Sequence, residues 1–189
     1  MLAPGAGAPS SSAWMVAWRD RLATLGDVQA FDYPYMRAGR KTPDRLPALV
    51  EAHRTALAEA RLRAGGPVYL IGKSMGGRVG CHLALDEEVA GVICLGYPLR
   101  SGSTGALRDQ VLLALRRSIF FVQGTRDPLC PLDQLANVRA RMTAPSTLLV
   151  VEGGNHSLEI SAQQRKATGE TQPIVDTRVL AAIGTFTEG

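Results

Sequence analysis

The sequence predicts an α/β fold in which helices cover both faces of a doubly wound, mostly parallel sheet. Short apolar runs alternate with helical patterns along the whole chain, which is typical of parallel strands joined by crossover helices. Three of these runs end in glycine-containing turns that carry Ser74, Asp127 and His156. Parallel sheets place functional residues at such carboxyl ends. With 189 residues, the chain is expected to form one domain, residues 1–189.

The expected elements follow one another in regular alternation. A strand at 28–31 precedes a helix at about 47–63, where a proline fits the first helical turn. The apolar run at 68–71 predicts the next strand, and the apolar and small residues after Ser74 predict a helix. The remaining expected elements are strands at 89–95, 119–123 and 147–151 and helices at 131–142 and 175–186, with a loop at 161–173.

Residues 72–76 read Gly-Lys-Ser-Met-Gly, a Gly-x-Ser-x-Gly motif between the strand at 68–71 and the helix that follows it. In this context the motif is typical of a nucleophile elbow, a strained turn that exposes a serine at the edge of a sheet. Glycines are needed on both sides of the serine because larger side chains would collide with the strand or the helix. Ser74 is therefore the predicted nucleophile.

A serine nucleophile needs a base, and the base needs an acid that orients it. Asp127 lies in a turn just after the strand at 119–123, and His156 lies in a loop just after the strand at 147–151. Each residue also has an ordinary interpretation. Asp127 precedes a proline and could cap a turn, and His156 could be a loop histidine without a catalytic role. The order serine, acid, histidine at one edge of the sheet predicts a catalytic triad. His53 and His82 lie within helical patterns, away from the strand ends.

Composition limits the remaining possibilities. The formal net charge is +4, and the basic residues form one local cluster without interleaved aromatic residues: Arg37, Arg40, Lys41 and Arg45. A solvated loop is the ordinary interpretation, and recognition of an anionic substrate by Arg37 or Arg40 is the alternative; nucleic-acid binding is not expected. No metal-ligand spacing, cofactor motif, apolar membrane span or signal peptide is recognised, so we expect no cofactor, no metal and a cytoplasmic location.

Six segments resemble the small, lidless α/β-hydrolases related to dienelactone hydrolase, and among them bacterial relatives of the hydrolase-like domain of testis-expressed and chromatin-complex proteins. The resemblance implies an α/β-hydrolase sheet without a lid domain and a hydrolase acting on carboxylic esters. Where the family usually has His-Gly-Ala-Gly, this chain has Pro4 before Gly5-Ala6-Gly7, and the N-terminal strands of the family are apparently missing. The matching segments are residues 5–9, 31–36, 72–77, 96–99, 124–127 and 154–157.

These observations predict a serine carboxylesterase that acts through an acyl-enzyme on a small-molecule ester. The backbone N–H groups of Met75 and Ala6 are the predicted oxyanion hole, because Met75 follows the nucleophile and Ala6 lies in a glycine-flanked turn. Arg37, Arg40 and Tyr97 are the predicted substrate-binding residues. Acyl or thioester transfer by the same triad, and a non-catalytic interaction module with this fold, remain open, as does the oligomeric state.

Overall fold

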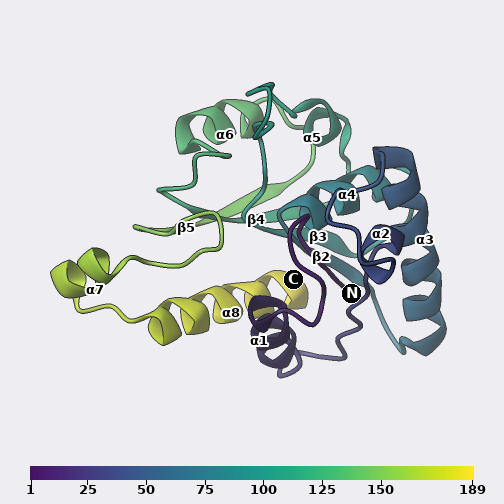
Figure 1. Ribbon diagram of the computed structural model, residues 1–189, viewed down its shortest axis with the longest axis horizontal. Helices are drawn as coiled ribbons and strands as arrows, with labels where there is room; N and C mark the ends of the chain where they lie inside the picture. Colours follow the sequence, from purple (N-terminus) through teal and green to yellow (C-terminus); the bar gives the residue numbers. More distant parts are fainter.

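A single five-stranded sheet forms the centre of the protein in a computed structural model that describes residues 1–189 (Figure 1). All neighbouring strands are parallel and the spatial order is β1-β2-β3-β4-β5, so the predicted parallel α/β architecture is confirmed. The strands are β1 (Leu2–Ala3), β2 (Tyr69–Lys73), β3 (Gly91–Leu95), β4 (Ile119–Gly124) and β5 (Ser146–Val151).

Helices cover both faces of this sheet, as Figure 1 shows. One face packs against α3 (Leu46–Arg63), α4 (Met75–Leu83), α5 (Gln110–Ala114) and α6 (Leu132–Arg139). The other face packs against α1 (Ala13–Leu22) and α8 (Gln172–Glu188). Two short helices, α2 (Pro34–Arg37) beside α3 and α7 (Ala162–Thr168) at the periphery, complete the chain.

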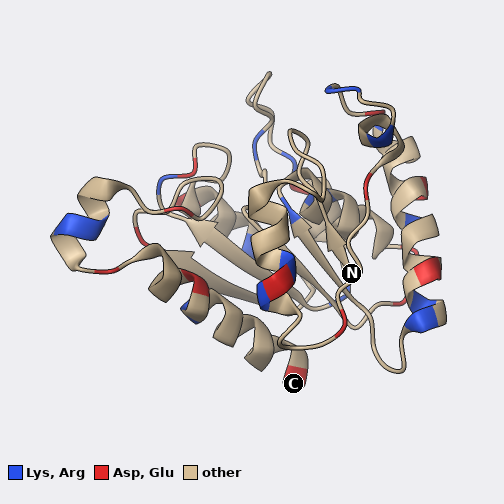
Figure 2. Cartoon of the chain, turned by 60° about the horizontal axis from the view of Figure 1, so that its bottom comes forward, with Lys and Arg blue, Asp and Glu red and all other residues tan.

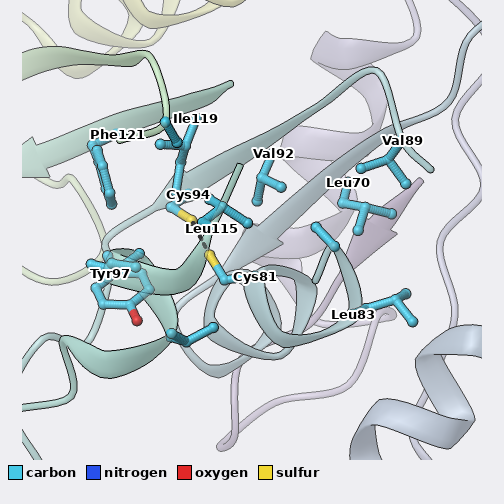
Figure 3. Packing of buried hydrophobic residues seen from close by; sticks show 14 of the residues in the cluster. Leu70, Cys81, Leu83, Val89, Val92, Cys94, Tyr97, Leu115, Ile119 and Phe121 are labelled. Carbon is cyan, nitrogen blue, oxygen red and sulfur yellow. Dashed lines mark hydrogen bonds between the residues drawn. The ribbon is translucent and has the colours of Figure 1, made fainter. Parts of the chain in front are cut away.

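The central strands alternate strictly between the two cores. In β3, Val92 and Cys94 face the core under α3 to α6, while Ile93 and Leu95 face the core under α1 and α8. Figure 3 shows the first of these cores, where the thiols of Cys81 and Cys94 meet at 3.9 Å. Because both faces are buried, the central strands must be apolar throughout, which is why the sequence shows them as continuous apolar runs.

The N-terminal edge of the sheet differs from the prediction. The strand expected at 28–31 is reduced to one bridge between Ala30 and Leu2. The segment at 28–31 has β1 as its only neighbour. Because β1 has two residues and ends before Pro4, it cannot support a ladder of more than this one bridge. Short as it is, β1 lies inside the sheet, because Leu2 pairs with Ala30 on one side and with Ile71 on the other.

Two further differences concern helices. The loop expected at 161–173 contains α7, and α8 begins at Gln172, where a threonine and a proline flank its first residue. The N-terminal helix α1 was not predicted, although Met15, Trp18 and Leu22 follow helical spacing and are buried.

The connection between β3 and α5, residues 96–109, is an irregular loop without an inserted helix, so the chain has no lid domain. Acidic and basic residues are interspersed over the outer helices (Figure 2), and Arg61 on α3, for example, pairs with Glu87 at 2.7 Å. No helix combines the length and the hydropathy that a membrane crossing requires.

Candidate active site

Ser74 lies in the turn between β2 and α4, with φ of 50° and ψ of −115°. This backbone conformation is unfavourable for a non-glycine residue and persists only where the surroundings impose it. The packing around it is tight: a Cβ on Gly72 would lie 2.1 Å from the Gly77 nitrogen, and one on Gly76 would lie 2.6 Å from the Ala3 carbonyl oxygen. Both glycines are therefore required for the turn that exposes the Ser74 hydroxyl.

The structure brings Ser74, His156 and Asp127 together in one hydrogen-bonded series. The His156 Nε2 atom lies 2.7 Å from the Ser74 Oγ atom, and the His156 Nδ1 atom lies 2.7 Å from the Asp127 Oδ2 atom. The Asp127 side chain is fully buried, whereas that of His156 is 26% exposed. A buried acid behind an accessible base is the arrangement in which a carboxylate fixes the imidazole tautomer and the imidazole accepts a hydroxyl proton.

Asp127 receives three hydrogen bonds that favour its charged form. Besides His156, the Leu129 N–H donates to Oδ1 at 2.8 Å and the Gln123 side-chain amide donates to Oδ2. Burial by itself raises the pKa of Asp127, but these hydrogen bonds together hold the pKa below its usual value. Asp127 therefore stays ionised at neutral pH despite its burial.

The two predicted oxyanion donors come from the turn after Ser74 and from the N-terminal loop beside it. Met75 is the first residue of α4, so its N–H has no intrahelical acceptor. Gly5 approaches Ser74 so closely that a Cβ on it would lie 3.5 Å from the Ser74 Cβ atom. The next residue, Ala6, has an N–H without a partner in the chain, while its carbonyl accepts a hydrogen bond from the Tyr35 hydroxyl at 2.9 Å.

The predicted substrate-binding residues are placed differently from one another. Arg37 ends α2 and is exposed, and Arg40 is exposed and pairs with Asp44 at 2.7 Å; no contact links either arginine to the triad. Tyr97 does not line the site, contrary to the prediction. Its ring is fully buried against Phe121 in the core (Figure 3), and its hydroxyl donates to the Arg108 carbonyl at 3.2 Å. The ring belongs to the core between the sheet and α3 to α6.

Sequence reasoning missed two residues that support the site. Gln123 has no exposed surface, accepts a hydrogen bond from the Tyr97 N–H at 3.0 Å and donates to Asp127. The sequence contains a signal for Gln123, because it is the only polar side chain in the otherwise apolar run of β4, just before the final glycine. Tyr35 carried no comparable signal, because nothing local in the sequence shows that its hydroxyl reaches Ala6.

No group of three or more histidine, cysteine or acidic side chains lies together in a way that could hold a metal ion. The three cysteines, Cys81, Cys94 and Cys130, are free and buried. The chemical groups gathered at this edge of the sheet are thus a hydroxyl, an imidazole, a carboxylate and backbone N–H donors.

A family model described as an alpha/beta hydrolase domain matches residues 1–188. Since the match spans almost all of the sequence, the chain belongs to the alpha/beta-hydrolase family. The family assignment agrees with the resemblance that the sequence motifs predicted.

Solved structures with the same fold share little sequence identity with this chain. An alpha-beta serine hydrolase homologue from Coxiella burnetii has a TM-score of 0.68 at 18% identity, over 82% of this chain and 75% of that one. Dienelactone hydrolase from Anabaena variabilis has a TM-score of 0.69 at 15% identity, over 99% and 83%. The esterase domain of a Rhodothermus marinus protein has a TM-score of 0.66 at 16% identity, over 98% and 84%. At these identities the likeness concerns the fold.

Proposed function

We propose that this protein is a serine hydrolase that cleaves small carboxylic esters through an acyl-enzyme on Ser74. The observation that carries the proposal is the unbroken series of two 2.7 Å contacts from Ser74 through His156 to Asp127. The proposal is also supported by similarity in fold to a serine hydrolase homologue and to an esterase domain.

In the proposed first half-reaction, the Ser74 Oγ atom attacks the ester carbonyl carbon while His156 Nε2 accepts the hydroxyl proton. The carbonyl oxygen becomes an oxyanion, to which the Met75 and Ala6 N–H groups donate. The bond between the carbonyl carbon and the alcohol oxygen then breaks, and His156 returns its proton to the leaving oxygen. Asp127 stabilises the imidazolium in between and holds its tautomer.

In the second half-reaction, water takes the place of the alcohol. His156 accepts a proton from water as the water oxygen attacks the acyl carbon; the bond between that carbon and the Ser74 Oγ atom then breaks, and His156 returns the proton to Oγ. The products are the carboxylic acid and the free serine, so His156 acts as base and acid once in each half-reaction. We expect short or compact acyl groups to be preferred, because no lid supplies apolar surface for a long chain.

Turnover of p-nitrophenyl esters from acetate to decanoate tests this function. The proposal predicts hydrolysis that is strongest for short acyl chains and that disappears in Ser74→Ala, whereas Ser103→Ala, in an exposed loop, retains it. No hydrolysis of any ester by the folded wild type would favour an interaction module instead. Transfer of the acyl group to an added alcohol or thiol in preference to water would identify a transferase.

A further inference from the structure

Two consecutive carbonyl groups of the loop that carries the base are held by side chains from elsewhere in the fold. The Lys73 ammonium, at the end of β2, donates to the His156 carbonyl. The Trp14 Nε1–H, at the start of α1, donates to the Ser157 carbonyl at 3.0 Å. The two donors also contact each other, because the Lys73 Nζ atom lies 5.3 Å from the centre of the Trp14 ring. This geometry allows a cation–π interaction.

The loop needs such support. It lies outside regular secondary structure, and Leu158, two residues after the base, has a positive φ of 65°. A non-glycine residue in this conformation costs about 1–3 kcal/mol, so surrounding contacts must maintain it. The loop also packs tightly against the turn just after β3, since a Cβ on Gly96 would lie 2.4 Å from the His156 carbonyl oxygen.

Core packing alone does not explain why Lys73 is buried. Its side chain is buried, no carboxylate forms an ion pair with it, and the other two lysines, Lys41 and Lys166, are exposed. Burial lowers its pKa to about 8, although the charges of Asp127 and Glu159, which face it, offset part of this effect. An apolar side chain of the same length would fill the space without the cost of desolvating an ammonium. The buried charge therefore needs an explanation beyond core packing.

We propose that Lys73 is a positioning residue, whose ammonium fixes the His156 carbonyl and thereby keeps the imidazole between Ser74 and Asp127. Lys73 does not touch the reacting atoms; it acts through the backbone of the base. Trp14 provides the second anchor, one residue further along the same loop. The inference rests on the proposed function in one respect, namely that His156 is the base.

The main test compares Lys73→Met with Lys166→Met, an exposed lysine that serves as the matched control. Lys73→Met keeps an unbranched apolar stem but removes all three donors. For a short p-nitrophenyl ester, we expect kcat to fall about 10- to 100-fold with KM within about twofold, because small displacements of a catalytic group reduce turnover more than binding. Lys166→Met should match the wild type. An unchanged kcat in Lys73→Met would overturn the proposal.

A spectroscopic measurement separates positioning from stability and from the proposed function. The proton between His156 Nδ1 and Asp127 gives a downfield NMR signal that reports the geometry of this hydrogen bond without any turnover. We expect the signal to shift or broaden in Lys73→Met and, to a smaller extent, in Trp14→Phe, which retains a ring but lacks the N–H donor. Should Lys73→Met fail to fold, Trp14→Phe alone provides the decisive spectrum.

The outcomes are distinguishable. A wild-type spectrum in folded Lys73→Met, or in Trp14→Phe where the lysine variant does not fold, would overturn the positioning role even if esters are hydrolysed. A shifted spectrum in a protein that hydrolyses no ester would support the positioning role while the proposed function fails.

Discussion

The two halves of the candidate site are built in different ways. On one side, Asp127 accepts hydrogen bonds from Gln123, Leu129 and His156, and the His156 ring also contacts the Ser74 hydroxyl. On the other side, the Gly5–Ala6–Gly7 turn, where the oxyanion donor is proposed, is held at Ala6 by a single side-chain contact, the Tyr35 hydroxyl. The first half depends on side chains with many supports, and the second on a backbone group with few.

This difference predicts which substitutions should abolish activity and which should only reduce it. In the acid–base half, removing a reacting side chain removes the chemistry itself, whereas removing a support such as Lys73 displaces a side chain that other hydrogen bonds still hold. In the oxyanion half, removing the Ala6 N–H removes the proposed donor itself, whereas removing the Tyr35 hydroxyl only frees the peptide that carries it. The predictions below test this contrast.

The largest effect is expected for Asp127→Asn. The asparagine NH2 group can donate a hydrogen bond to His156 Nδ1, which then carries no proton, so the ring proton moves to Nε2 and the imidazole cannot act as base toward Ser74. We expect kcat to fall about 10⁴-fold, as measured by p-nitrophenyl ester turnover at neutral pH. Asp133→Asn, an exposed acid in the first turn of α6, is the control and should retain wild-type activity. A loss below tenfold in Asp127→Asn would refute the role of the acid.

The second prediction concerns the oxyanion half. Ala6→Pro removes one backbone N–H, and loss of a single oxyanion donor should lower kcat by about 10²–10³-fold with KM nearly unchanged. Ala8→Pro, two residues further along the same loop, should have a much smaller effect. Thermal unfolding must show that both variants fold. Wild-type kcat in folded Ala6→Pro would remove the N-terminal turn from the catalytic site.

The third prediction uses the buried charge beside the His156 loop. The pKa of Lys73 is about 8 in the folded chain and about 10.5 in the unfolded chain. Between these values the unfolded chain binds a proton that the folded chain lacks, so the free energy of unfolding should rise with pH. Between pH 8 and 10.5, the free energy of unfolding of the wild type should rise by on the order of 3 kcal/mol relative to that of Lys73→Met. Urea denaturation of both proteins measures this; a pH-independent difference would show that Lys73 is not desolvated.

The smallest effect is expected for Tyr35→Phe. The substitution keeps the ring in its buried position but removes the hydrogen bond to the Ala6 carbonyl, which is worth about 1 kcal/mol. If this bond orients the Ala6 peptide, kcat should fall about fivefold. Tyr33→Phe is the control, because its hydroxyl contacts His53 at 3.2 Å and not the turn. Equal losses in both variants would point to a general effect on packing.

The sequence predicted those parts of the molecule whose signals are local. Continuous apolar runs marked β2 to β5, and glycine turns after three of them marked Ser74, Asp127 and His156. A parallel sheet brings the carboxyl ends of its strands to one edge. The strands β2 to β4 are apolar because both of their faces are buried, whereas β5 lies at the edge of the sheet and is partly exposed.

The remaining parts depend on contacts between distant segments. The strand expected at 28–31 is shortened because its neighbour β1 has only two residues, so its length depends on a distant segment of the chain and not on its own residues. Tyr97, in the matching segment 96–99, is predicted to bind substrate, but its side chain is buried in the core. Lys73 and Trp14 meet across 59 positions of sequence, so their joint contact with the His156 loop emerges only from the fold.

The most direct test of the account is to locate the covalent adduct of a fluorophosphonate by peptide mass spectrometry. A serine activated by His156 should react through its Oγ atom, so the account predicts one adduct per chain, on the peptide that contains Ser74, and none in Ser74→Ala or after denaturation. Rapid stoichiometric labelling at any other residue, or undiminished labelling of Ser74→Ala, would contradict it.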